Sequence, residues 1–125
     1  MQQTKNRQNK RKLGECYEEL AAGYLIEKGY IILQKNYRNI FGEIDILARQ
    51  GDYLVFVEVK YRSSKAYGDP AEAVGIYKQR RISKAALGYI FSRGYSYDMP
   101  CRFDVIAVYQ NGVIRHIPDA FEFSY

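Results

Sequence analysis

The stretch that decides the fold reads GEIDILARQGDYLVFVEVKYR and covers residues 42–62. Two runs rich in Ile, Val, Phe and Tyr flank the turn signal at residues 50–52, which predicts a pair of antiparallel strands. These strands also carry Glu43, Asp45, Glu58 and Lys60, where strands favour apolar or uncharged side chains. Because clustered carboxylates repel one another and lose hydration when buried, these side chains either face water or hold a positive charge.

Alternation along the strands divides this hairpin into an apolar face and a charged face. A turn with an even number of residues makes the faces of the two strands coincide, and it places Asp45 opposite Phe56 or Glu58. The apolar face is then expected to hold Ile44, Ile46, Ala48, Val55, Val57 and Val59. A solvated polar face would give the same alternation, but Leu54 and Phe56 lie among the charges, so we expect a helix to cover most of this face.

The charged face has a chemical interpretation. Two carboxylates a few ångströms apart at a partly dry site repel by roughly 4 kcal/mol, which a divalent cation, a raised pKa or pairing with Lys60 and nearby arginines would offset. Mg²⁺ takes oxygen ligands from one or two carboxylates and completes its shell with water and phosphate oxygens, which suits Asp45 and Glu58. Lys60 would then orient an attacking water and stabilise charge on a phosphodiester. The pattern therefore predicts metal-assisted phosphodiester hydrolysis.

Periodicity predicts the remaining elements. A helix is expected over residues 14–28, and Glu18 lies at the border of its apolar stripe, where it either reaches the charged site or is an ordinary boundary charge. Strands are expected at 30–38, 102–109 and 113–117, and a helical stretch runs from Asp69 to near Gly94, with Gly75 as a dividing point. The order of one helix, three strands, a helix and two strands indicates an α/β fold with a mixed sheet flanked by helices.

Positive charge gathers in two parts of the chain. Composition indicates a single domain over residues 13–125, preceded by a basic tail at residues 1–12 that we expect to be disordered and able to lie along a phosphate backbone. The tail has five basic residues and no acid, which leaves 14 basic and 14 acidic residues in the remainder. A second cluster follows the hairpin and is expected to contact phosphates: Arg62, Lys78, Arg80, Arg81 and Lys84.

Other features limit the class of protein. Cys16 and Cys101 are too few for a disulfide framework and lie at no zinc spacing, and no run of 18 apolar residues occurs. We therefore expect a cytoplasmic protein with no membrane partner. His116 is expected to be structural, and Arg102 and Asp104 to pair with each other or with a neighbour.

The pattern of Asp45, about a dozen residues, and then Glu58-X-Lys60, with a preceding glutamate-bearing helix and a following basic helix, resembles the PD-(D/E)XK nuclease superfamily. It is especially similar to archaeal Holliday-junction resolvases. Nearly the whole chain from Gly14 onwards also resembles the bacterial YraN family. The stretches that carry this resemblance include Gly14-X-X-Tyr-Glu18, Gly-Glu-Ile-Asp45, Val-Phe-Val-Glu58-Val-Lys60-Tyr-Arg62 and Cys-Arg102-Phe-Asp104-Val.

The resemblance implies a restriction-endonuclease-like fold and a site for Mg²⁺ or Mn²⁺. In that site Glu18, Asp45 and Glu58 correspond to the acidic metal ligands and Lys60 to the catalytic lysine. Glu43 belongs to the Gly-Glu-X-Asp signature without a defined role. Ile44 stands where the superfamily name places proline, which is usual for this family.

The implied partner is nucleic acid, DNA more than RNA, with branched substrates such as junctions or flaps and a homodimer as the natural way to cut two strands. Two alternatives remain at this stage. One is a nucleic-acid-binding module of the same fold that does not cleave, and the other is a protein-interaction domain with a solvated acidic face.

Overall fold

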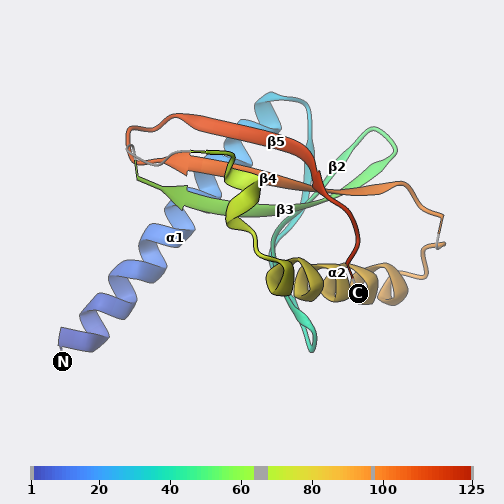
Figure 1. Ribbon diagram of the computed structural model, residues 1–125, viewed down its shortest axis with the longest axis horizontal. Helices are drawn as coiled ribbons and strands as arrows, with labels where there is room; N and C mark the ends of the chain where they lie inside the picture. The colour runs from blue at the N-terminus through green and yellow to red at the C-terminus, as the bar shows by residue number, and fades with distance from the viewer. Residues whose placement is uncertain (1, 64–67, 97, 125) are drawn as a thin grey trace.

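The centre of the molecule is a mixed five-stranded sheet in the order β1-β2-β3-β4-β5 (Figure 1). The structure is a computed structural model that describes residues 2–63, 68–96 and 98–124. The strands are β1 (Ile31–Asn39), β2 (Gly42–Gln50), β3 (Tyr53–Arg62), β4 (Cys101–Tyr109) and β5 (Ile114–Phe121). Only β3 and β4 pair in parallel; the other neighbours are antiparallel. A parallel pair needs a crossover, which the segment with the second helix provides.

Two helices accompany the sheet: α1 (Gln2–Glu27) and α2 (Ile76–Ser92). A short 3-10 helix, η1 (Pro70–Ala73), precedes α2, and its entry is capped by Asp69, whose Oδ1 accepts a hydrogen bond from the Ala71 N–H at 2.9 Å. Gly75 is the N-cap of α2. The predicted division of this helical stretch at Gly75 is therefore confirmed.

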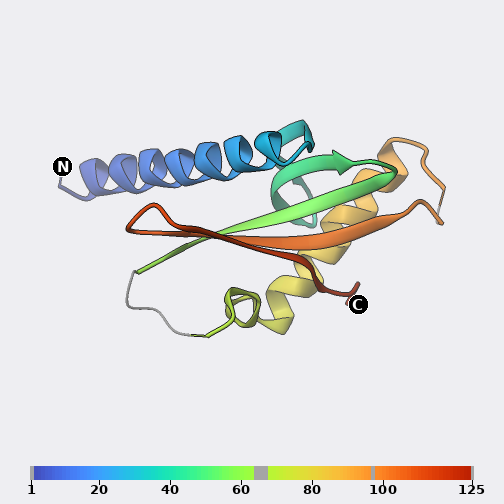
Figure 2. The same cartoon turned by 90° about the horizontal axis from the view of Figure 1, so that it is seen from above.

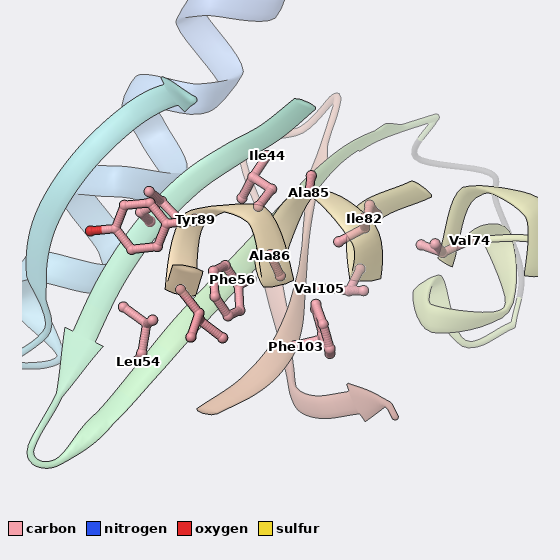
Figure 3. Close-up of a cluster of buried hydrophobic side chains, with 12 residues drawn as sticks. Ile44, Leu54, Phe56, Val74, Ile82, Ala85, Ala86, Tyr89, Phe103 and Val105 are labelled. Atoms are coloured by element: carbon pink, nitrogen blue, oxygen red, sulfur yellow. The ribbon is translucent and has the colours of Figure 1, made fainter. Parts of the chain in front are cut away.

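The helices cover opposite faces of the sheet (Figure 2). One apolar cluster lies on the α2 side, where Leu54 and Phe56 from β3 pack against Ala86 and Tyr89 (Figure 3). The expectation that a helix covers these two residues is confirmed. The second cluster, on the α1 side, contains Ile46, Ala48, Val55 and Val57 together with Ala21 and Leu25. Packing on both faces makes this an α/β fold consistent with the predicted restriction-endonuclease-like architecture.

The register of the central hairpin departs from the prediction at one place. The β2–β3 ladder runs from the Gln50–Tyr53 pair to the Ile46–Val57 pair, around a two-residue turn. Beyond this pair, the Asp45 side chain replaces a backbone acceptor: Asp45 Oδ2 accepts a hydrogen bond from the Val59 N–H at 2.8 Å. Ile44 consequently packs in the α2-side cluster, so its predicted place with Ile46 is wrong.

The start of α1 also differs from the prediction. The helix begins at Gln2, whereas we expected it to begin at residue 14. The first part of α1 extends beyond the edge of the sheet (Figures 1 and 2). The segment before Gly14 has no proline or glycine and consists largely of Gln, Lys and Arg, which are good helix formers, so the helix continues upstream from its packed half.

A buried polar cluster joins β4, β5 and the connection between α1 and β1. Asp104 is fully buried, and its carboxylate accepts hydrogen bonds from Arg102 Nε at 2.9 Å and from the Asp119 N–H at 3.0 Å. His116 Nε2 lies 2.7 Å from Asp104 Oδ2, and Arg102 also donates to the Tyr30 hydroxyl at 2.6 Å. The predicted pairing of Arg102 with Asp104 is confirmed, and His116 takes a structural place beside them.

Candidate functional site

Asp45 and Glu58 meet at the point where β2 leaves the ladder with β3. They share a pocket of about 230 Å³ whose other lining residues are Gly42, Glu43, Lys78, Arg81 and Ile82. A neighbouring pocket of about 250 Å³ shares Asp45 and Glu58 and is also lined by Glu18 from α1 and Lys60 from β3. The structure therefore brings together the three acids and the lysine that the sequence singled out.

Glu58 is the most buried acid of this group, with 4% of its surface exposed. Two ammonium groups approach it. Lys78 Nζ lies 2.5 Å from Glu58 Oε1, and Lys60 Nζ lies 3.8 Å from the same oxygen. Lys78 comes from the first turn of α2 and was expected to contact phosphates, but here it contacts the acidic site. A buried carboxylate without such a partner would be strongly unfavourable, so this pairing stabilises the arrangement.

Two acids of the site, Asp45 and Glu18, resist ionisation. Burial, followed by the charge of Glu58, raises the pKa of Asp45 to about 8, against the lowering effect of the Val59 N–H bond. Burial also raises the pKa of Glu18, and the nearby charge of Glu43 adds to this. A cation bound beside these carboxylates would offset the free-energy cost of ionising them in the folded protein.

The pKa values of Lys60 and Lys78 shift in opposite directions. Burial, followed by the charge of Lys78, lowers the pKa of Lys60. Burial would lower the pKa of Lys78 as well, but the hydrogen bond to Glu58 and its charge outweigh burial and raise it. Lys78 is thus the firmly charged partner of the carboxylates, whereas Lys60 is the lysine from which a proton is more easily removed.

Glu18, Asp45, Glu58 and Lys60 are called the acidic centre below. The remaining predicted residues lie around it. Glu43 lines the first pocket and forms an exposed ion pair with Arg38 at 3.3 Å. Arg81 lines the same pocket, and the guanidinium of Arg80 lies 5.7 Å from the centre of the Tyr77 ring. Lys84 is exposed on α2, and Arg62 is half-buried at the end of β3.

Sequence reasoning missed one aromatic feature of the site. The rings of Tyr17 and Tyr61 stack with centroids 4.5 Å apart and an interplanar angle of 12°, and both line the pocket that holds Lys60. The sequence offered one signal for this pair, which is that each tyrosine is next to a predicted site residue: Tyr17 precedes Glu18, and Tyr61 follows Lys60.

The donor set suits a hard divalent cation. Among residues 2–63, 68–96 and 98–124, no group of three or more His, Cys, Asp or Glu side chains is arranged to hold a metal ion. Mg²⁺, however, needs only one or two protein carboxylates, because water and phosphate oxygens fill the rest of its shell. The ammonium of Lys78 against Glu58 shows that a cation is accommodated there. Asp45 and Glu58 are thus the residues that could hold Mg²⁺ or Mn²⁺, with Glu18 facing them.

Comparison with known proteins places the chain in a family. The sequence model described as "Uncharacterised protein family UPF0102" matches residues 17–108, which include all four residues of the centre. The chain belongs to the UPF0102 family. The predicted resemblance to the YraN family is thereby confirmed.

Several UPF0102 relatives are similar over nearly their whole length. The protein from Syntrophus aciditrophicus is 53% identical over 116 residues, covering 90% of both chains. The protein from Lachnoclostridium phytofermentans is 49% identical over 114 residues, covering 91% of this chain and 96% of the relative. The protein from Geotalea uraniireducens is 44% identical over 126 residues, covering 98% of both.

In the part of the chain that the structure describes, no helix is long and apolar enough to cross a membrane.

Proposed function

We propose that this UPF0102 protein is a metal-dependent nuclease that hydrolyses phosphodiester bonds in DNA, with branched substrates such as junctions or flaps as its targets. The observation that carries the proposal is the convergence of Asp45, Glu58, Glu18 and Lys60 on one pocket. The resemblance to the PD-(D/E)XK superfamily and to archaeal Holliday-junction resolvases supports it, because that resemblance assigns roles to the same four residues.

Each residue of the centre has a proposed role. Asp45 and Glu58 would hold Mg²⁺ or Mn²⁺, and Glu18 would assist directly or through water. The bound ion would polarise the phosphate and lower the pKa of an attacking water. Lys60 orients that water, and its lowered pKa makes its proton easier to remove.

The nucleic acid would lie across the face that carries α2. Arg80, Arg81 and Lys84 present positive charge there, and Arg81 also lines the acidic pocket. Lys10 of α1 lines an adjoining pocket together with Glu18 and Arg38. Such contacts to phosphates position the substrate without reading its sequence, which suits an enzyme that recognises the shape of DNA.

A cleavage assay tests this function. Wild-type protein is incubated with junction, flap, nicked, single-stranded and duplex DNA in the presence of Mg²⁺ or Mn²⁺, and with EDTA as the metal-free condition. We expect cleavage of at least one substrate to stop with EDTA and to fall by at least about a hundredfold in Glu58→Gln and Lys60→Met. Asp52→Asn is the matched control, since Asp52 is an exposed acid in the turn of the same hairpin.

The results separate this proposal from its alternatives. Undiminished cleavage by both Glu58→Gln and Lys60→Met would contradict the proposed site. Tight, metal-independent DNA binding without cleavage of any substrate would instead indicate a non-cleaving binding module. Absence of both DNA binding and divalent-metal binding would indicate a protein-interaction domain.

A further inference from the structure

Lys78 makes the closest charged contact of the acidic centre. Its Nζ lies 2.5 Å from Glu58 Oε1, whereas the Nζ of Lys60 lies 3.8 Å away. Lys78 also lines both of the pockets that Asp45 and Glu58 share. The Lys78 ammonium group therefore lies where the two carboxylates converge, at the position that a positively charged ligand would take.

A divalent ion and this ammonium group compete for the same carboxylate oxygen. Mg²⁺ binds carboxylate oxygens at about 2.0–2.1 Å. An ion at that distance from Glu58 Oε1 would lie very close to Lys78 Nζ, and two cations so near each other in a half-buried pocket repel strongly. Binding of the ion at this oxygen therefore favours release of Lys78 from Glu58.

The side chain of Lys78 is placed so that it can leave. Its side chain is 39% exposed, compared with 24% for the side chain of Lys60 and 5% for the side chain of Glu58. Its flexible stem begins in the first turn of α2, on the same wall of the pocket as Arg81. Movement away from Glu58 would bring the ammonium group towards solvent at the rim of the pocket, beside the exposed Arg81.

We propose that Lys78 is a tethered cation that balances Asp45 and Glu58 until a divalent ion displaces it, and that the displaced ammonium group then contacts the substrate phosphate. The inference rests on the proposed function, because it takes these two carboxylates as the metal ligands. Lys78 thereby stabilises the fold and weakens metal binding through the same contact. It couples loading of the site with the divalent ion to contact with the substrate.

Direct measurement of Mn²⁺ binding tests the proposal without any cleavage assay. The free hydrated ion gives an electron paramagnetic resonance signal that decreases when the ion binds, so a titration yields the dissociation constant. We expect Lys78→Met to bind Mn²⁺ at least about tenfold more tightly than wild type, which corresponds to about 1.4 kcal/mol. Lys84→Met, which removes the same charge from an exposed position of α2, should remain within about twofold.

Thermal unfolding provides a second measurement on the same proteins. Without Mn²⁺, Lys78→Met should melt at a lower temperature than wild type, because the buried carboxylates have lost a cation. Saturating Mn²⁺ should raise its melting temperature by more than it raises that of wild type, because tighter binding to the native state gives more stabilisation. If Lys78→Met does not fold, Lys78→Gln serves instead, since its amide can still donate a hydrogen bond to Glu58.

The outcomes distinguish this inference from the function on which it rests. Measurable Mn²⁺ binding with equal affinity in wild type and Lys78→Met would overturn the tethered cation while leaving the metal site intact. Binding by Lys78→Met and none by wild type would support the tethered cation in its strongest form. No Mn²⁺ binding by wild type or by either Lys78 variant would overturn both the inference and the proposed metal site.

Discussion

Replacing Asp45 by Asn is expected to stabilise the protein near neutral pH. Burial, followed by the charge of Glu58, raises the pKa of Asp45 from its ordinary 3.8 to about 8, so the folded state favours the protonated acid. The stability associated with this proton is fully present below pH 3.8 and is lost as the pH rises towards 8. Asparagine carries no charge, and its amide oxygen can still accept the Val59 N–H that Asp45 accepts at 2.8 Å.

The size of the effect follows from the two pKa values of Asp45. Between them, each pH unit lowers the free energy of unfolding by about 1.4 kcal/mol. From pH 3.8 to pH 7 this gives an upper limit of roughly 4 kcal/mol. Water entry and side-chain rearrangement reduce the cost of a buried charge, so we expect Asp45→Asn to stabilise by about 1 to 3 kcal/mol at pH 7.

Urea unfolding followed by circular dichroism at pH 5, 6, 7 and 8 measures this effect. Wild type should lose stability across the series relative to Asp45→Asn, so the difference between the two proteins grows with pH. Asp52→Asn, in the exposed turn, should change the free energy of unfolding by less than about 0.5 kcal/mol. If Asp45→Asn is less stable than wild type at pH 7, or if the difference is independent of pH, the carboxylate is not destabilised by its surroundings.

Three further substitutions test the packing that supports the site. Asp104→Ala should lower the free energy of unfolding by about 3 to 5 kcal/mol, because it leaves buried donors without their acceptor; a loss below about 1 kcal/mol in urea would contradict this. Phe103→Ala should cost about 3 to 5 kcal/mol in the same assay, since Phe103 is 1% exposed in the α2-side cluster. Gly88→Ala should cost about 1 to 3 kcal/mol, because the new Cβ would lie 2.7 Å from Asn39 Nδ2, which donates to a carbonyl of α2. Gly23→Ala is the control for Gly88, since a Cβ there meets nothing within 4 Å and should be neutral or stabilising by up to about 1 kcal/mol in thermal or urea unfolding.

The sequence predicted most of the fold because its signals are local. The 42–62 hairpin, its even-numbered turn and the division of the second helical stretch at Gly75 all follow from alternation and turn chemistry over a few residues. Leu54 and Phe56 among charged residues predicted a covering helix, and α2 covers them. Alternation also brought Asp45 and Glu58 to one place, because cross-strand neighbours are fixed once the turn is known.

Only the tertiary structure decided the details of the site. Ile44 packs on the α2 side because the Asp45 side chain replaces a backbone partner of Val59, and no local pattern reports such an exchange. The place of Lys78 against Glu58 likewise depends on how α2 lies across the sheet, although these residues are 20 positions apart in the chain. Periodicity specifies which face of an element is apolar, whereas the long-range packing of elements determines which charges from different elements meet.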